Sequence, residues 1–225
     1  MTFADVMAQE REALLAEYLF KQGVSGINVA PYCAVSDFEV LLRIPSILRN
    51  QHPVQIEELP GTDPGYAFVQ SCGSLRYKFL WVHADNDNYR TDYETFLRKY
   101  HGLILERLPR DYHVDHLYSR KRAIGMGLQY IRAILLHESI NTSHGAGYEK
   151  SRTQSGVGRP GRERRLDEVM LMKLCGVASP RKSLPLTAET LLHAQRIASL
   201  FGMPVREVER NIRELMDLAS PKPGS

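Results

Sequence analysis

The chain has 225 residues, of which 43% are hydrophobic and 24% charged, and its formal net charge is +3. These values are ordinary for a soluble globular protein, and a chain of this length can bury a core without a disulfide framework. The mild positive charge says little about partners, because an average does not report how charge is distributed.

The cysteines and the N-terminus indicate a soluble, cytoplasmic protein. Cys33, Cys72 and Cys175 stand far apart and form no CxxC pair, which indicates reduced thiols and disfavours a cysteine-based zinc site. The N-terminus has no basic region before an apolar run, so it does not resemble a signal peptide. No apolar stretch approaches the roughly 20 residues that span a bilayer.

The first part of the chain, residues 1–100, predicts an N-terminal α+β region. Apolar residues at helical spacing predict a helix over Phe3–Gln22. Tyr66–Cys72 and Leu75–Val82 alternate or run apolar on either side of a Gly-Ser break, which predicts two paired strands. A polar turn then leads into a predicted helix over Tyr89–Tyr100.

Residues 101–152 contain the segment on which the functional hypothesis depends. Tyr112–Leu117 predicts a short strand, and Tyr118–Gln129 predicts a basic loop that contains two glycines. Tyr130–Leu136 is an apolar strand, and a helix is expected to begin near Ser139–Asn141. The predicted order is therefore strand, long loop, strand and helix.

Asp115 and His116 are the candidate catalytic pair in this segment. Hydrolysis of a phosphodiester requires an activated water and stabilisation of the leaving oxygen. An imidazole with an ordinary pKa of roughly 6.5 can activate water at neutral pH, and a divalent ion can stabilise the leaving group. Adjacent residues of a strand point to opposite faces, so the ligand and the base either need a distorted strand or approach the phosphate from two sides.

The run Asp115-His116-Leu117, followed by an apolar strand and the helix start at Asn141, resembles the core of HNH (ββα-metal) endonucleases. The resemblance covers about 40 residues and implies that Asp115 binds the metal and His116 is the general base. The chain would be a divergent member, since it lacks flanking CxxC zinc knuckles and a clear counterpart of the family's middle Asn. The expected fold class is α+β, with a ββα-metal core among mostly helical flanking elements.

The resemblance leaves the second metal ligand open between two residues of the predicted helix. Asn141 is the first choice, because one carboxylate and one amide suit Mg²⁺ or Mn²⁺, which retain several waters. His144 lies one turn later on the same face and is the alternative. His113 lies two residues before Asp115, on the same side of the strand, and is a candidate for hydrogen bonding to the ligand.

Basic residues surround the candidate site in the sequence. Arg120, Lys121 and Arg122 follow the pair directly, and Lys150 and Arg152 follow the predicted helix. Such residues supply most of the sequence-independent affinity for nucleic acid. The alternative for the first three residues is a solvated loop, with no contact to a ligand.

The remainder divides into a basic linker and a helical C-terminal region. Residues 153–165 are rich in glycine and arginine and predict a linker or long loop. Within residues 166–225, Leu166–Cys175 and Thr187–Ala219 predict helices.

Residues 195–215 fit the spacing of a helix-turn-helix. Ala198 suits the close packing of the first helix, Gly202 the turn, and Val208 the core. Arg206 and Arg210, with Arg213, would then face outward and contact nucleic acid. The alternative, which we favour, is a helical hairpin whose arginines pair with the neighbouring glutamates.

Three functions follow from these patterns. The leading hypothesis is a metal-dependent endonuclease that acts on DNA, analogous to anti-phage defence or mobile-element effectors; the pattern does not separate DNA from RNA. The second is a non-catalytic nucleic-acid-binding regulator that uses the C-terminal helices. The third is a subunit that docks on a protein complex through its basic linker and terminal helices.

Overall fold

The structure is a computed structural model. It describes residues 1–11, 14, 31–43, 54–72, 77–104, 106–149, 164–174, 176–180, 185–201 and 204–218. The chain divides into two compact units, residues 1–136 with 159–165 and residues 137–158 with 166–225. Helices and strands are mixed, which confirms the α+β class.

A mixed-order sheet forms the centre of the first unit. Its strands among the described residues are β1 (Tyr32–Val35), β2 (Val54–Glu58), β3 (Ala67–Cys72), β4 (Tyr77–His83), β5 (Tyr112–His116), β6 (Tyr130–His137) and β7 (Arg164–Arg165). The order is β2-β3-β4-β6-β1-β7, and β5 also pairs with β6. The predicted pairing of β3 with β4 is confirmed as an antiparallel ladder.

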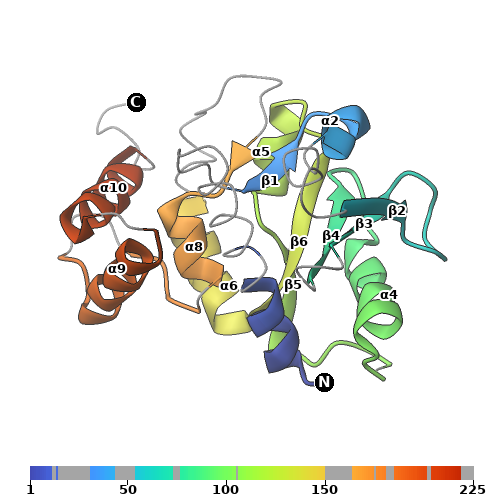
Figure 1. The fold of residues 1–225 in the computed structure, drawn as a ribbon, viewed down its shortest axis with the longest axis horizontal. Helices are drawn as coiled ribbons and strands as arrows, with labels where there is room; N and C mark the ends of the chain where they lie inside the picture. Colours follow the sequence, from blue (N-terminus) through green and yellow to red (C-terminus); the bar gives the residue numbers. More distant parts are fainter. Residues whose placement is uncertain are drawn as a thin grey trace. The chain divides into compact units, whose positions relative to one another are not determined.

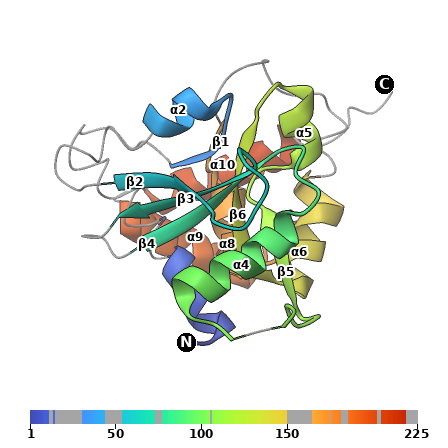
Figure 2. The same ribbon diagram turned by 90° about the vertical axis from the view of Figure 1, so that its right-hand side faces the viewer.

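Helices cover both faces of this sheet, because successive residues of each strand point to opposite sides. Val69, Leu80 and Ala133 share one core with helix α4 (Tyr89–His101) and with the helical residues 3–11. Phe68, Trp81 and Tyr130 form a second core with α2 (Phe38–Arg43). Figures 1 and 2 show α2 and α4 on opposite sides of strands β2 to β4.

Helix α4 was predicted from its pattern, and the structure confirms it. Tyr93, Phe96 and Leu97 are fully buried against the sheet, as the 3.6-residue period requires. The helix ends at Gly102, whose φ of 64° is left-handed and whose N–H donates to the carbonyl of Leu97.

The segment between β5 and β6 differs from the prediction of a loop. It contains a short helix, α5 (Arg120–Gly125), in which Ala123 is the buried residue. Gly127 follows with φ 68°, and the N–H of Leu128 donates to the carbonyl of Ala123. A helix with one small buried residue produces no apolar periodicity, so the sequence pattern did not reveal it.

The predicted linker also differs at its C-terminal end. Arg164 and Arg165 form β7, which pairs antiparallel with β1. The guanidinium carbon of Arg165 lies 3.9 Å from the ring centroid of Tyr32. The preceding residues 151–163, and with them Lys150 and Arg152, lie outside the described part of the chain.

The division into units falls inside the segment 101–152 that the sequence grouped as one core. The boundary lies between Leu136 and His137, since β6 is the strand that pairs with β1 and β4 of the first unit. Helix α6 (Glu138–His144) begins the second unit. Each unit is therefore described separately below.

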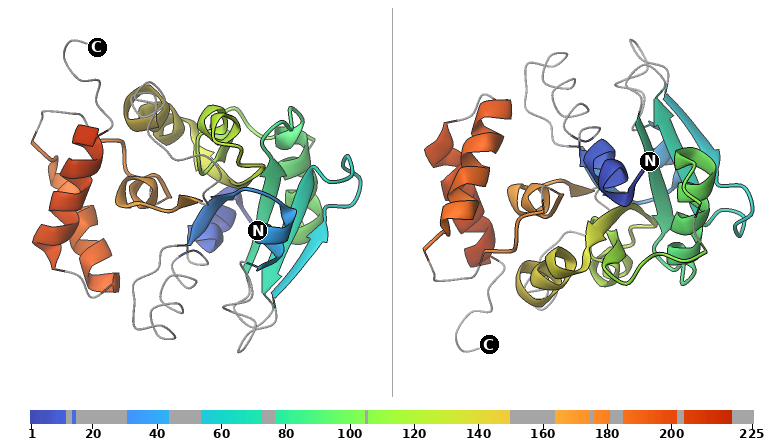
Figure 3. Two further views of the ribbon diagram at one scale, coloured as in Figure 1. Left: turned by 90° about the horizontal axis from the view of Figure 1, so that it is seen from above. Right: turned by 90° about the horizontal axis from the view of Figure 1, so that it is seen from below.

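The second unit is helical in its described residues. After α6 come the π-helical turn η1 (Gly145–Glu149), α8 (Glu168–Leu174), α9 (Ala188–Phe201) and α10 (Val205–Leu218). Both views in Figure 3 show α9 and α10 side by side. Ala198, Val208 and Ile212 are buried. In the described residues of the whole chain, no helix combines the length and apolar character that a membrane span requires.

Candidate active site

Strand β5 carries the candidate pair at its C-terminal end. Val114 and His116 are buried, whereas His113 and Asp115 are half-buried, so the pairs occupy opposite sides of the strand. Val114 belongs to the core under α4. The structure thus places His116 on the α4 side of β5 and Asp115 on the other side.

The imidazole of His116 packs against the first residue of α4. Its ring centroid lies 4.3 Å from that of Tyr89, with the planes inclined at 45°, and only 7% of the residue is exposed. Since little room remains for rotation, the contact limits the orientations that the His116 ring can adopt.

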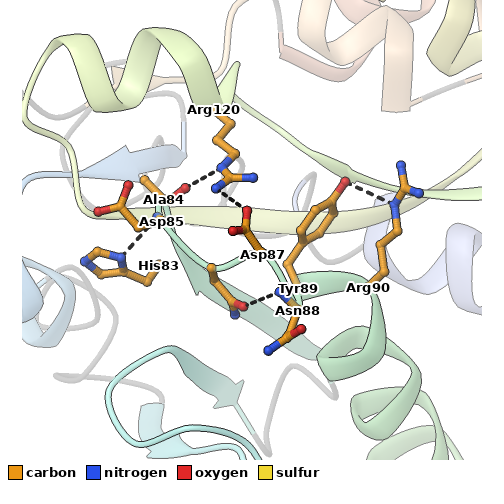
Figure 4. Close-up of polar contacts among 9 residues, drawn as sticks. His83, Ala84, Asp85, Asp87, Asn88, Tyr89, Arg90 and Arg120 are labelled. Atoms are coloured by element: carbon orange, nitrogen blue, oxygen red, sulfur yellow. Dashed lines mark hydrogen bonds and ion pairs between the residues drawn. The ribbon is translucent and has the colours of Figure 1, made fainter.

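Tyr89 also contacts a cation. The Nε atom of Arg90 donates a hydrogen bond of 3.1 Å to the Tyr89 hydroxyl, and the guanidinium carbon lies 5.6 Å from the ring centroid. Figure 4 shows Arg90 reaching back to this hydroxyl from the start of α4. An exposed arginine therefore touches the aromatic ring that packs on the candidate base.

A hydrogen-bonded turn holds the start of α4 in place. The buried Asn86 side chain donates to Asp92 (2.8 Å) and accepts from the backbone N–H of Asn88 (2.8 Å). Burial raises the pKa of Asp92, while the hydrogen bond from Asn86 opposes this effect. Asn86 thus ties the turn to the first turn of α4 and determines where Tyr89 and Arg90 begin.

Arg120, predicted to contact nucleic acid, connects α5 to the same turn. Its Nε donates to the carbonyl of Ala84 (2.6 Å), and one terminal nitrogen lies 2.7 Å from a carboxylate oxygen of Asp87. Figure 4 shows both contacts. Because these protein groups occupy two sides of its guanidinium, Arg120 acts as a structural link in this arrangement.

The two basic residues that follow differ from Arg120. Lys121 is exposed. The guanidinium carbon of Arg122 lies 4.8 Å from the ring centroid of Tyr118, which is itself buried. Lys121 is the most accessible of the three predicted phosphate contacts on α5.

In the second unit, His144 is a buried structural residue. It is 1% exposed, and its Nε2 lies 2.9 Å from the carbonyl oxygen of Val177, so Nε2 must be the donor. The neighbouring Ser143 hydroxyl accepts from the N–H of Ser179 (3.1 Å). These contacts hold the segment after α8 against α6, and they occupy Nε2 of His144.

Asn141, the other candidate ligand, lies one turn earlier on α6 and is half-buried. The helix is capped by His137, whose Nδ1 accepts the N–H of Ser139. The start of α6 is therefore fixed by its own sequence. Asp115 and His116 belong to the first unit, and Asn141 and His144 to the second.

Asp115 and Asn141 belong to different units, and each carries an oxygen atom of the kind that a hard divalent ion accepts. A carboxylate from Asp115 and an amide oxygen from Asn141 are the oxygen ligands that Mg²⁺ accepts alongside water. Within the part of the chain that the structure describes, no three or more His, Cys, Asp or Glu residues gather as a group that could hold a metal.

The predicted contacts on the C-terminal helices lie on one exposed face of α10. Arg206, Arg210 and Arg213 are exposed, while Val208 and Ile212 are fully buried. Arg210 forms an ion pair of 3.7 Å with Glu214 on the same helix. The face therefore combines three arginines with at least one neutralising partner.

Tyr89 and Arg90 are residues that the sequence analysis did not single out. They stand in an ordinary helix start, far from the Asp115-His116 motif along the chain, and no spacing rule connects the two segments. The sequence did contain one indication, the polar turn before them, because such a turn predicts that a helix begins next to the end of a strand.

Comparison with known families, with characterised proteins and with solved structures finds no match for this chain.

Proposed function

We propose that the protein is an HNH-type endonuclease that uses Mg²⁺ or Mn²⁺ to hydrolyse phosphodiester bonds in DNA. The observation that carries this proposal is the placement of His116. Its imidazole lies at the end of β5, against Tyr89, with Asp115 on the opposite side of the strand and cationic Arg90 beside Tyr89. A base in a restricted orientation, with a carboxylate adjacent in sequence and a cation beyond one aromatic ring, suits phosphodiester hydrolysis.

In the proposed reaction His116 acts as the general base. One imidazole nitrogen takes a proton from water as the water oxygen bonds to phosphorus, and the bond from phosphorus to the leaving oxygen breaks. The leaving oxygen then takes a proton from solvent. A divalent ion, when bound, would stabilise the negative charge on the phosphate and the leaving oxygen.

We assign Asp115 as a ligand of the metal and do not assign His144 to it. The Nε2 of His144 already donates to the Val177 carbonyl, and the residue is almost completely buried. The carboxylate oxygen of Asp115 is also the better donor for Mg²⁺, which prefers oxygen to imidazole nitrogen.

The proposal is tested by cleavage of supercoiled plasmid with Mg²⁺ or Mn²⁺. The wild type should nick or linearise the plasmid, and His116→Gln should lower the rate at least about 100-fold, as loss of a general base does. His83→Ala is the matched control, because His83 lies between Tyr66 and Tyr130 in the same unit and has no assigned role.

Circular dichroism and thermal melting should show that both histidine variants remain folded. If His116→Gln cleaves the plasmid as fast as the wild type does, His116 is not the general base. A wild-type protein that cleaves neither DNA nor RNA with either metal would contradict the nuclease assignment as a whole.

A second candidate function is a non-catalytic nucleic-acid-binding regulator. The specific observation in its favour is the exposed arginine face of α10, on the side opposite to the buried Val208 and Ile212. If it is correct, Arg206→Gln with Arg210→Gln should abolish DNA binding, while His116→Gln should bind as the wild type does. The ion pair of Arg210 with Glu214 reduces the net charge of this face and makes this function the second choice.

A further inference from the structure

We propose that Arg90 binds a backbone phosphate of the substrate beside the one that is hydrolysed, and that Tyr89 holds Arg90 in position to do so. The inference rests on the proposed nuclease function, because it takes His116 to mark the reaction centre. Arg90 and Tyr89 belong to neither the Asp115-His116 motif nor the basic residues that follow it in the sequence.

The first support is the continuous contact from His116 to Arg90. The Tyr89 ring packs on the His116 ring at 4.3 Å between centroids, and the Tyr89 hydroxyl accepts the hydrogen bond from Arg90 Nε. One aromatic side chain therefore separates the candidate base from a guanidinium group. A nucleic-acid strand bound at His116 would pass within reach of this group.

The second support is the hydrogen-bonding capacity of Arg90. A guanidinium carries five N–H groups, and among the described residues Arg90 uses only the one on Nε. Its two terminal nitrogens have no carboxylate or carbonyl partner within that part of the chain. Their planar, paired N–H groups match the oxygens of a phosphate, which arginine binds in a bidentate manner.

Arg120, which Figure 4 also shows, differs from Arg90 in how many of its donors are already bound. Its Nε and a terminal nitrogen are bound by Ala84 and Asp87, and its side chain is 33% exposed. Figure 4 shows Arg120 pointing toward the turn that contains Ala84 and Asp87, and Arg90 hydrogen-bonded through Nε alone. Of these two arginines, Arg90 is the one that retains donors for a ligand.

Tyr89 has a positioning role in this arrangement. Its ring packs against His116, and its hydroxyl accepts from Nε, which holds the guanidinium of the exposed Arg90 side chain by one edge. Tyr89→Phe keeps the ring contact and removes only the bond to Arg90. This variant separates the positioning of Arg90 from the packing of His116.

The test is DNA binding by the full-length protein, measured by fluorescence anisotropy with a labelled mixed-sequence duplex and Ca²⁺ in place of Mg²⁺. Arg90→Gln should weaken binding about tenfold and lower the slope of log K against log salt by roughly 0.9, the value for one phosphate contact. Arg90→Lys should retain the slope with about threefold weaker binding. Tyr89→Phe should also weaken binding about threefold.

Arg43→Gln is the matched control. Arg43 is an exposed arginine of α2, which covers the other face of the sheet, so this variant makes the same charge change away from His116. It should leave the affinity and the salt slope unchanged. If Arg90→Gln equals Arg43→Gln in both quantities, the inference is overturned.

Cleavage kinetics separate this inference from the proposed function. In an active enzyme Arg90→Gln should raise KM with a smaller change in kcat, since the contact is made in the ground state as well as the transition state. A wild type that cleaves, with Arg90→Gln unchanged in KM and affinity, overturns the inference alone. A wild type that does not cleave, with the binding effects present, overturns the nuclease function and retains Arg90 as a phosphate contact.

Discussion

Glu10 shows how burial changes the chemistry of a single side chain. It lies in the helical residues 3–11, is 2% exposed, and accepts hydrogen bonds from the Tyr93 hydroxyl and from the N–H of Leu135 (3.0 Å). Burial raises its pKa from 4.5 to about 8, although both hydrogen bonds favour the charged form. Glu10 is therefore neutral in the folded protein at neutral pH, while it is charged in the unfolded chain.

This difference predicts a pH-dependent stability. Between pH 4.5 and about 8 the folded protein keeps the proton that the unfolded chain loses, so the free energy of unfolding should fall as pH rises through this window. The loss is on the order of 5 kcal/mol from this group. Urea denaturation at several pH values should show a flatter profile for Glu10→Gln.

Glu39→Gln is the control for this measurement, because Glu39 is exposed on α2. Its profile should follow that of the wild type. A Glu10→Gln profile as steep as that of the wild type would mean that Glu10 does not hold its proton in the folded state.

At the scale of single residues, the structure also bears on the two candidate metal ligands of α6, Asn141 and His144. From the sequence, Asn141 and His144 lie one turn apart on one helix face, with Asn141 as the first choice. The tertiary structure gives His144 a structural contact, since its Nε2 donates to the carbonyl of Val177, a residue that follows α8. A histidine on a helix gives no local indication of which distant carbonyl it will meet.

At the scale of elements, α10 illustrates what an amphipathic pattern predicts well. The expected burial of Val208 and exposure of Arg206, Arg210 and Arg213 are confirmed. Asn211 of the same helix donates to Glu168 of α8 (3.0 Å), which joins α10 to its own unit. The buried side of α10 packs within the second unit, as the helical-hairpin interpretation requires.

Ile212 should account for much of that packing, because it is fully buried. Ile212→Ala should lower the free energy of unfolding of the second unit by about 2 to 5 kcal/mol, through lost apolar contact and the cavity that remains. Arg213→Ala, an exposed neighbour on α10, should change it by less than about 0.5 kcal/mol. Equal effects of the two variants in thermal or urea denaturation would contradict the assignment of these faces.

At the scale of the whole molecule, the division into two units predicts separate responses to destabilisation. The boundary at Leu136 and His137 places the sheet in one unit and α6 with the C-terminal helices in the other. Each unit has its own buried residues, and local opening follows such cooperative units.

Hydrogen exchange measured by mass spectrometry tests this division. Ile212→Ala should speed exchange in residues 137–149 and 166–218 and leave the protection of β3, β4 and α4 unchanged. Tyr93→Ala in the first unit should have the reverse effect. Faster exchange throughout the chain in either variant would show that the two units unfold as one.

Local pattern was sufficient where an element contacts its surroundings through a regular face. The helical spacing of the buried residues Tyr93, Phe96 and Leu97 predicts α4. The buried apolar runs of β4 and β6 likewise predict strands. The adjacency of Asp115 and His116 is likewise a property of the sequence alone.

Only the tertiary structure decided which distant residues meet. The packing of Tyr89 on His116, the burial of Glu10 between Tyr93 and Leu135, and the pairing of β7 with β1 join segments that are far apart along the chain. The physical reason is that such contacts depend on chain topology and on the closure of the core, and neither leaves a local period in the sequence. Arg90 therefore emerged as a candidate contact only from the fold.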